Sequence, residues 1–256
     1  TLQVNGMTPE VVDAGLVDPG EAIFYLRSPT REQGEGDEPG LVIERRRYQS
    51  ATLHEDLIVE NRTRRTTSAV LELTLGTDFA DLLDVRIEGP VVHRPVQAVV
   101  ADGTLRLVYH GEGFERATAI SSSSEVEIAG NRMVMDVSID PLTRWKTCVD
   151  VVPILDGLAV PIGRTCDRGV PPTETTVPRR VEAPPRLRSS ADALEHLWVQ
   201  GLHDLAALEF RIDGHLGFAA GIPWYVALFG RDSVITAAEA MLVGTEAALG
   251  TAQLLA

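Results

Sequence analysis

The sequence is short of positive charge. Its 256 residues include 23 lysines and arginines against 37 aspartates and glutamates, which gives a formal net charge of −14. Proteins that bind nucleic acid or anionic lipid do so mainly through clustered lysine and arginine side chains that neutralise phosphates. We therefore expect neither a nucleic acid nor a membrane as a partner, and the sequence leaves the oligomeric state open.

The chain also lacks long apolar runs and has only two cysteines. No stretch approaches the roughly 18 to 20 apolar residues of a membrane span, and the first residues lack the pattern of a signal peptide, so we expect a soluble, cytoplasmic protein. Cys148 and Cys166 form no C-x-x-C spacing, so the sequence indicates neither a disulfide framework nor a zinc site. We expect two buried free thiols, with a single disulfide as the alternative, and no metal or cofactor.

Prolines are sparse except in one segment. Five of the 15 prolines lie in residues 171–190. Because proline removes a backbone donor and fixes φ, this segment should be extended and poor in regular structure. We expect it to be a linker between a domain over residues 1–170 and a second domain over residues 191–256.

Before the linker, apolar residues alternate with polar ones in short runs, which is the pattern of strands with one buried face. Asp102-Gly103 and Gly130-Asn131 stand between such runs, where two-residue hairpin turns need positive φ. The expected strands are 22–27, 41–48, 53–60, 70–75, 82–87, 96–100, 105–109, 117–121, 125–128, 133–139 and 144–152. A series of this kind without an intervening helical pattern predicts a mainly β fold, a large antiparallel β-sandwich.

After the linker, the apolar period changes to 3.6 residues. A helix is expected over about 190–210, opened by a capping box of Ser189 and Asp192. A second helix should begin near Asp232 or Ser233 and end at Gly244. Its inward residues are expected to be Val234, Ile235, Ala238, Met241 and Leu242.

A third helix, capped by Thr245, should run to the end of the chain and form a hairpin with the second. Three amphipathic helices in about 66 residues cannot cover all of their own apolar stripes. We therefore expect the helical domain to be incomplete and the chain to be a fragment of a longer protein.

The most unusual segment is 217–233, which holds four aromatics, three glycines and a proline in a chain that is 5% aromatic. The indole of Trp224 can stack on the C–H face of a sugar ring, while Arg231 and Asp232 supply donors and acceptors for vicinal hydroxyls. The alternative is structural: Asp232 or Ser233 caps a helix, Arg231 pairs with a carboxylate, and Trp224 and Phe229 fill the core. Composition by itself favours the structural alternative.

Two motifs carry a resemblance to a known family. The run IPWYVALFGRDSVI at 222–235 resembles the start of the (α/α)6 barrel in bacterial amylo-α-1,6-glucosidases, which are relatives of glycogen debranching enzymes. The run DFADLLDVR at 78–86 is similar to the signature of their N-terminal β-sandwich domain. The motifs occur in the expected order, so the resemblance covers nearly the whole chain, although the first 40 residues match less well.

The resemblance implies an exo-acting α-glucosidase that cleaves an α-glucan or oligosaccharide with inversion, chiefly at α-1,6 branches. Inversion needs a carboxylic acid and a carboxylate about 6.5 to 9.5 Å apart. It also implies that Arg231 and Asp232 bind sugar hydroxyls and that Trp224 and Phe229 line the pocket. The catalytic acids would lie beyond Ala256, so this chain alone is expected to be inactive.

Two other hypotheses stay open. The sandwich could be a carbohydrate-binding or regulatory module, for which Trp145, Tyr109 and Tyr48 are the candidate exposed aromatics, or the chain could be a scaffold without sugar chemistry. Asp78, Asp81 and Asp84 recur every three residues but lack the glycine and distal glutamate of a calcium-binding hand, so a solvated turn is expected there.

Overall fold

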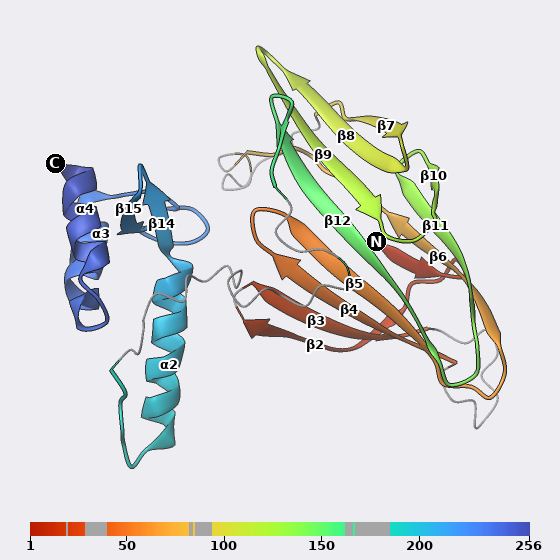
Figure 1. The fold of residues 1–256 in the computed structure, drawn as a ribbon, viewed down its shortest axis with the longest axis horizontal. Coiled ribbons are helices and arrows are strands. Elements are labelled where there is room, and N and C mark those ends of the chain that lie inside the picture. The colour runs from red at the N-terminus through yellow and green to blue at the C-terminus, as the bar shows by residue number, and fades with distance from the viewer. Residues whose placement is uncertain (19, 29–39, 82–83, 85–93, 162–165, 167–184) are drawn as a thin grey trace. The chain divides into compact units, whose positions relative to one another are not determined.

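The computed structural model describes residues 1–18, 20–28, 40–81, 84, 94–161, 166 and 185–256. The chain divides into two compact units, Thr1–Pro171 and Pro172–Ala256. The first consists of strands and the second mainly of helices (Figure 1). Most of the segment 171–190, for which we expect a linker, lies outside the described residues, as does the strand expected at 82–87 apart from Asp84.

The first unit is a β-sandwich, and the predicted mainly β fold is confirmed. Its strands are β1 (Leu2–Val4), β2 (Glu10–Asp18), β3 (Glu21–Arg27), β4 (Leu41–Gln49), β5 (Leu53–Asn61), β6 (Thr67–Thr74), β7 (Gln97–Ala101), β8 (Thr104–Gly111), β9 (Phe114–Ser122), β10 (Glu127–Ala129), β11 (Arg132–Ile139), β12 (Arg144–Leu155) and β13 (Leu158–Ala159). Strands β1, β2 and β13 are not among the strands expected from the sequence.

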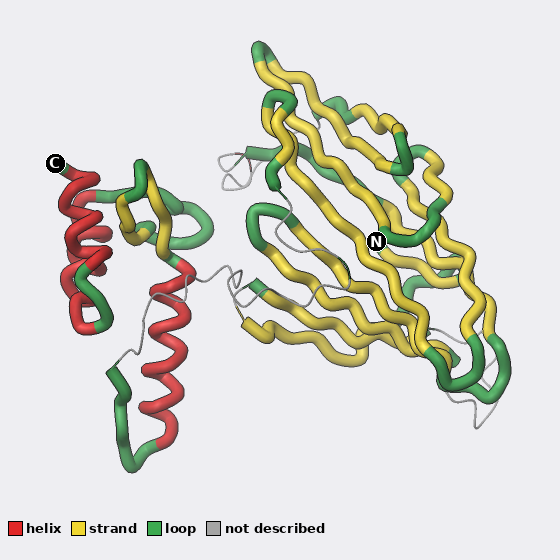
Figure 2. The backbone as a smooth tube through the Cα atoms, in the orientation of Figure 1, coloured by secondary structure: helices red, strands yellow, loops and turns green. Residues whose placement is uncertain are grey.

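Two antiparallel sheets make up the sandwich (Figure 2). The smaller has the strand order β1-β6-β11-β10. The larger has the order β2-β3-β4-β5-β12-β9-β8-β7, with β13 paired to β12. Two-residue turns join β7 to β8 and β10 to β11, and Asp102, Gly103 and Gly130 have the positive φ that the sequence predicts there.

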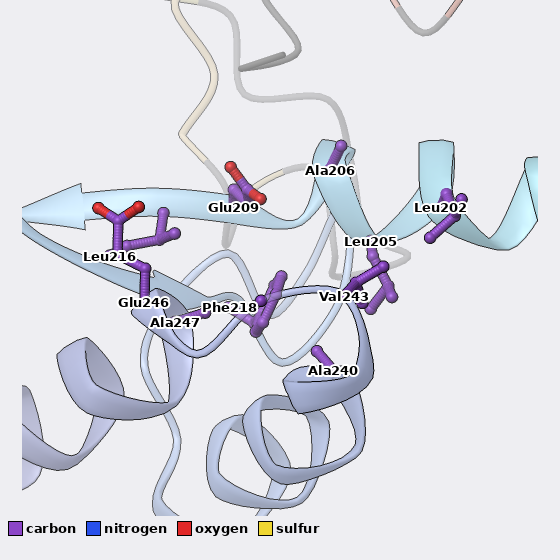
Figure 3. A pocket seen from close by; sticks show the side chains of 11 residues that line it. Leu202, Leu205, Ala206, Glu209, Leu216, Phe218, Ala240, Val243, Glu246 and Ala247 are labelled. Carbon is purple, nitrogen blue, oxygen red and sulfur yellow. The ribbon is translucent and has the colours of Figure 1, made fainter. Parts of the chain in front are cut away.

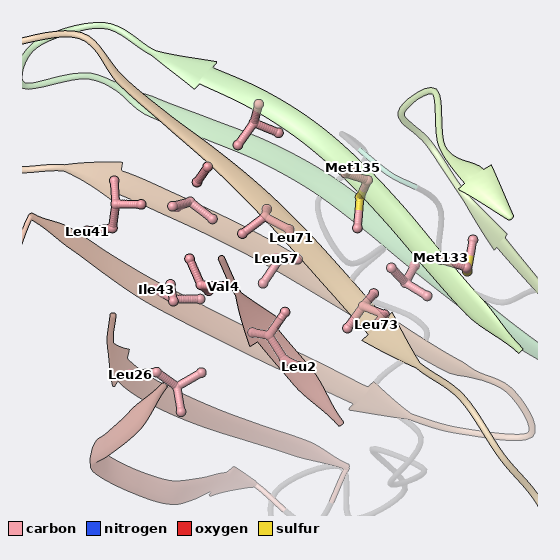
Figure 4. Close-up of a cluster of buried hydrophobic side chains, with 14 of the residues drawn as sticks. Leu2, Val4, Leu26, Leu41, Ile43, Leu57, Leu71, Leu73, Met133 and Met135 are labelled. Atoms are coloured by element: carbon pink, nitrogen blue, oxygen red, sulfur yellow. The ribbon is translucent and has the colours of Figure 1, made fainter. Parts of the chain in front are cut away.

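The core lies between the two sheets. Alternate side chains of β6 and β11, among them Leu71, Leu73, Met133 and Met135, face Leu57 and its neighbours on the larger sheet (Figure 4). All of these side chains are at most 3% exposed. Each fully buried leucine or methionine of this kind stabilises the fold by about 1.5 to 3 kcal/mol. The alternating apolar residues at 70–75 and 133–139 therefore form the buried faces of two neighbouring strands.

Strand β2 forms one edge of the larger sheet. Its pairing with β3 is interrupted twice, once at Val12 and once at Val17, where the register shifts by one residue. Four of its apolar side chains are exposed: Val11 at 58%, Val12 at 64%, Leu16 at 80% and Val17 at 59%. Each shift is a β-bulge, which leaves one residue of the bulged strand without a partner and increases the local twist.

The two cysteines form a disulfide, so the expectation of two free thiols is wrong. Cys148 lies on β12, and Cys166 follows β13 and lies over the same face of the larger sheet, with their Cα atoms 5.9 Å apart. The spacing of 18 residues could not predict this contact, because the number of residues between two cysteines does not show whether the fold brings them together.

The second unit contains the helices α2 (Asp192–Ala207), α3 (Gly230–Glu239) and α4 (Glu246–Leu255), the short 3₁₀-helix η1 (Ala240–Leu242) and a hairpin of β14 (Glu209–Ile212) and β15 (His215–Phe218). These helices fit the start of a helical barrel. Sequence analysis missed the hairpin, which occupies the end of the helix expected over 190–210.

The helix ends and faces differ from expectation in two respects. The carboxylate of Glu195, and not Asp192, accepts the backbone N–H of Ser189, so the predicted capping box uses a different acid. On α3 the buried residues are Ser233 and Ala237, followed by Ala240. The expected inward residues Val234 and Ile235 are 48% and 50% exposed.

No helix in the described part of the chain combines the length and the apolar character needed to cross a membrane.

Candidate functional site

The β14–β15 hairpin positions the segment 217–233. Asp213 and Gly214 both have positive φ and form its two-residue turn. The backbone N–H of Ala219, directly after β15, donates to the carbonyl of Leu208 at 2.8 Å. The loop that follows is held by paired backbone hydrogen bonds between Gly221 and Tyr225 at 3.1 Å. These hydrogen bonds fix the conformation of the first part of the loop that leads into α3.

Ser233 anchors the other end of this loop. Its side chain is fully buried, and its hydroxyl donates to the carbonyl oxygen of Phe218 on β15 at 2.8 Å. The same hydroxyl accepts the backbone N–H of Phe229, the residue before α3, at 3.1 Å. The serine of the FGRDS motif thus fastens the start of α3 to β15. This is close to the structural role that the sequence left open for it.

The structure brings three of the four predicted site residues together at the start of α3. Arg231 and Asp232 lie in its first turn with side chains that are 82% and 43% exposed, and their nearest charged atoms are 3.7 Å apart. A carboxylate in the first turn of a helix interacts favourably with the helix dipole. Phe229 precedes the helix and is 41% exposed. All three are open to a ligand, and Phe229 does not fill the core.

An aromatic that sequence analysis did not select completes this surface. Tyr225 is 44% exposed, and its ring meets that of Phe229 edge to face, with the centroids 5.9 Å apart. Trp224, the fourth predicted residue, is half-buried in the loop beside it. Only the number of aromatics in the segment could have pointed to Tyr225, because its contact with Phe229 depends on the turn at Gly221.

A small cavity lies where the end of α2, the β14–β15 hairpin, η1 and the start of α4 meet. It has a volume of about 60 Å³ and is lined by Leu205, Phe218, Ala240 and Val243, with Glu209 and Glu246 at its margin (Figure 3). Ligand pockets for small molecules are typically about 300 to 1,000 Å³. This cavity is therefore a packing gap of the second unit and not a sugar site.

A wider groove, of about 410 Å³, runs between α2 and the α3–η1 segment. Apolar side chains of α2, including Leu194, Leu197 and Trp198, form most of its wall, and Thr236 and Glu239 add the polar groups. Leu197 is 68% exposed and Leu242 is 76% exposed. The groove thus consists of helix faces that the described residues leave uncovered, as the sequence predicts for this domain.

The aspartates of the 78–86 motif form a compact turn around Arg94. Asp81 and Asp84 each accept the backbone N–H of the other at 3.0 Å, and Arg94 donates to Asp84. These bonds from Asp81 and Arg94 hold the pKa of Asp84 below its usual value. Phe79 stacks on Tyr109 at 5.9 Å, and the Arg94 guanidinium lies over the same tyrosine. The described part of the motif thus has a structural role.

A second cluster of polar side chains is buried on the larger sheet. His54 and Asp56 on β5 alternate with core residues, so they lie on the face of the sheet turned away from the core. They are 3% and 8% exposed. The Nδ1 atom of His54 is 2.6 Å from Asp150 and its Nε2 atom is 3.3 Å from Asp56, while Cys148 Sγ is 3.2 Å from the same Asp56 oxygen.

Burial alone would lower the pKa of His54, but its hydrogen bonds to Asp150 and Asp56 outweigh burial and raise the pKa to about 9. His54, Asp56 and Cys148 are also the group of potential metal ligands found among the described residues. Sequence analysis missed the cluster, because its members come from two strands that pair across about 90 residues of chain.

The aromatic residues considered for a sugar-binding sandwich are not exposed platforms. Trp145 packs against the core. Tyr109 lies between Phe79 and Phe114, with the centroid of Phe114 at 6.0 Å, and Tyr48 lies beside His54 at 6.1 Å. All three residues are partly buried, and each ring lies beside another ring or against the core.

Comparison with known proteins identifies the first unit. Residues 1–150 match the family described as the N-terminal domain of (some) glycogen debranching enzymes. The chain belongs to this family. The match covers most of the sandwich of this debranching-enzyme N-terminal domain and ends before the segment 217–233. The family is one of glycoside-hydrolase N-terminal domains, which relates the chain to carbohydrate chemistry. No curated protein matches the chain.

Among solved structures, the similarities are weak. A protein described as a kojibiose phosphorylase from the human microbiome is 10% identical over 54% of this chain and 18% of its own, with a TM-score of 0.39. Heparinase III is 10% identical over 62% and 24%, with a TM-score of 0.33. The heparan sulfate lyase HepC from Pedobacter heparinus is 12% identical over 61% and 24%, with a TM-score of 0.32. The chain thus spans about a quarter or less of these proteins, and likeness at this level carries no information about its activity.

Proposed function

We propose that this chain is the sugar-contacting N-terminal part of a debranching-type glycoside hydrolase that cleaves α-glucosidic linkages, chiefly α-1,6 branches, with inversion. In this proposal Arg231 and Asp232 bind hydroxyls of the terminal sugar, and Trp224 and Phe229 supply the apolar wall. The family of residues 1–150 supports the carbohydrate substrate. The exposed Arg231–Asp232 pair beside the Tyr225–Phe229 ring pair is the observation that carries the assignment of the site.

The chemistry of the segment fits binding better than catalysis. Asp232 is the only carboxylate in residues 217–233. Inverting hydrolysis needs two carboxyl groups on opposite sides of the scissile bond. We therefore propose that the proton-transferring acids come from residues outside 1–256 and that the chain alone binds sugar without cleaving it.

Calorimetric titration of the chain with branched maltooligosaccharides tests the site. Asp232→Asn and Arg231→Gln should each lose charge-assisted hydrogen bonds, which are worth about 1.5 to 3 kcal/mol, so affinity should fall at least about 10-fold. Glu239→Gln, an exposed acid at the other end of α3, is the matched control and should bind as the wild type does. Equal affinity of all four proteins would contradict the assignment.

The reaction itself is tested on the complete enzyme that contains this chain. Proton NMR of the first product formed from an α-1,6-branched oligosaccharide should show β-glucose, because inversion converts the α linkage to the β anomer. Release of α-glucose, or cleavage of α-1,4 linkages alone, would refute that part of the proposal.

A further inference from the structure

The buried cluster on the outer face of the larger sheet is not part of the proposed sugar site. Strand pairing places Asp56 of β5 directly opposite Cys148 of β12, and His54 directly opposite Asp150. Because the side chains of a strand alternate, all four project to the same face of the sheet. The ligand atoms of His54, Asp56 and Cys148 lie within 4.8 Å of one another.

The disulfide brings a second sulfur next to this group. Cys166 is bonded to Cys148, whose Sγ atom lies 3.2 Å from Asp56, so the sulfur of Cys166 is one S–S bond away from the cluster. One imidazole, one carboxylate and one sulfur therefore converge on one buried point, and reduction frees the second sulfur to join them. In proteins this is a ligand set for a tetrahedral transition metal, and thiolate ligands favour zinc over magnesium or calcium.

We propose that the reduced protein binds one zinc ion through His54, Asp56, Cys148 and Cys166, and that the disulfide closes this site. Zinc–nitrogen and zinc–oxygen bonds of about 2.0 to 2.2 Å and zinc–sulfur bonds of about 2.3 Å place neighbouring ligands about 3.3 to 3.8 Å apart. The contacts of Asp56 with His54 and Cys148, at 3.3 and 3.2 Å, are already close to that spacing. Once reduced, the two sulfurs must separate to reach it.

The redox step requires a dithiol reductant. One reductant sulfur attacks the Cys148–Cys166 bond to form a mixed disulfide, and the second closes the reductant's own disulfide and releases the protein thiols. Two electrons and two protons pass to the protein. Zinc then replaces the two thiol protons, which go to solvent, because the thiolate is the ligand form. In the oxidised protein neither sulfur is a thiolate, so only His54 and Asp56 remain as ligands.

Two neighbours shape the site. Asp150 lies 2.6 Å from Nδ1 of His54, which directs Nε2 toward Asp56. Carboxylates in this position orient the histidine of many zinc sites, and their loss typically lowers metal affinity 10- to 100-fold. Lys146 has its ammonium nitrogen 3.3 Å from the Asp56 oxygen that zinc would take, so metal binding displaces this contact.

Zinc titration of the full chain in both redox states tests the proposal. Protein reduced with dithiothreitol and desalted without oxygen should bind one equivalent of zinc in competition with a chromophoric chelator. The oxidised protein should bind at least about 10-fold more weakly, since it lacks both thiolates. Cobalt in place of zinc should give thiolate-to-metal charge-transfer absorption and the visible bands of a tetrahedral site in the reduced protein alone.

Variants identify the ligands. Cys166→Ser and His54→Asn should each lower zinc affinity at least 10-fold under reducing conditions, and Asp150→Asn about 10- to 100-fold. His110→Asn is the control, because this exposed histidine of β8 pairs with Glu115 and lies outside the cluster. If His54→Asn does not fold, Cys166→Ser and the two redox states of the wild type decide the question.

Three results would overturn the site. Equal zinc binding by reduced and oxidised protein would exclude the thiolates. A cobalt spectrum without thiolate absorption would do the same. An effect of His110→Asn as large as that of Cys166→Ser would show that the zinc binds elsewhere on the surface.

Discussion

A single buried hydroxyl connects the most distinctive motif of the sequence to the fold. Ser233 bonds both to Phe218 on β15 and to Phe229 before α3. These two bonds fix the direction in which the next residues leave the loop, so Arg231 and Asp232 point outward. The motif thus combines a buried anchor with two exposed polar groups within three residues.

Replacing this hydroxyl should destabilise the second unit. Ser233→Ala removes the hydrogen bond to the buried carbonyl of Phe218 and the one from the part-buried N–H of Phe229, so the free energy of unfolding should fall by about 1 to 3 kcal/mol. Urea unfolding followed by circular dichroism at the helical band measures the change. Thr245→Ala is the control, because Thr245 precedes α4 without a side-chain capping bond and should change stability by less than about 0.5 kcal/mol. Equal stability of Ser233→Ala and the wild type would show that the anchor is dispensable.

At the scale of residues, the sequence predicts local features and misses non-local ones. Arg231 and Asp232 could be selected because their chemistry and their place at a helix start are contiguous in the chain. The cluster of His54, Asp56 and Cys148 could not, because strand register creates it and no spacing encodes register. The disulfide was missed for the same reason.

At the scale of elements, helix α4 packs closely against strand β15. A methyl group added at Gly250 would lie 2.1 Å from the carbonyl oxygen of Leu216 and 2.8 Å from its nitrogen. Backbone atoms cannot move aside as a flexible side chain can. The absence of a side chain at Gly250 therefore sets the distance between this helix and the hairpin. Gly201, in the interior of α2, has no neighbour within 4 Å of the same position.

These two glycines make a matched pair. Gly250→Ala should lower the free energy of unfolding by about 1 to 3 kcal/mol, because overpacking outweighs the gain in helix propensity. Gly201→Ala should raise it by up to about 1 kcal/mol, since alanine favours the helix and nothing opposes it. Thermal unfolding of both variants and of the wild type shows whether each substitution raises or lowers stability. A stabilised Gly250→Ala would show that α4 does not pack closely on β15.

At the scale of elements, periodicity predicts that a helix exists but not which face is buried. The strands of the sandwich were predicted well, because every second residue meets the opposite sheet. On α3 the buried positions hold the small residues Ser233 and Ala237, while Val234 and Ile235 stay exposed. The large residues of such a helix indicate apolar surface without indicating what covers it.

The whole molecule is acidic, with a formal charge of −14, and some of its carboxylates are held in the charged form. Hydrogen bonds from the Glu115 backbone and Arg116 lower the pKa of Asp156, as those from Asp81 and Arg94 lower that of Asp84. A carboxyl group whose pKa is lowered by folding stabilises the native state above its ordinary pKa. That contribution disappears as the pH falls through the lowered value.

The contribution of these carboxylates to stability should be measurable at acidic pH. Above about pH 5 the wild type should be more stable than Asp84→Asn, and the difference should shrink as the pH falls below the ordinary carboxyl pKa of about 4. Urea midpoints measured at several pH values give this difference. Asp136→Asn, which removes an exposed acid from β11, should show no such trend. A difference for Asp84→Asn that does not change with pH would contradict the pairing with Arg94.

The two bulges of β2 affect whether this edge strand can pair with a second copy of the chain. A long, flat edge strand with exposed valines would offer an unpaired hydrogen-bonding ladder to a second chain, and such edges are starting points of aggregation. At Val12 and Val17 the ladder is broken and the strand twists. A neighbouring chain could therefore pair with only a few residues of β2 before losing register. The irregularities that interrupt pairing with β3 thus also protect the protein from edge-to-edge association.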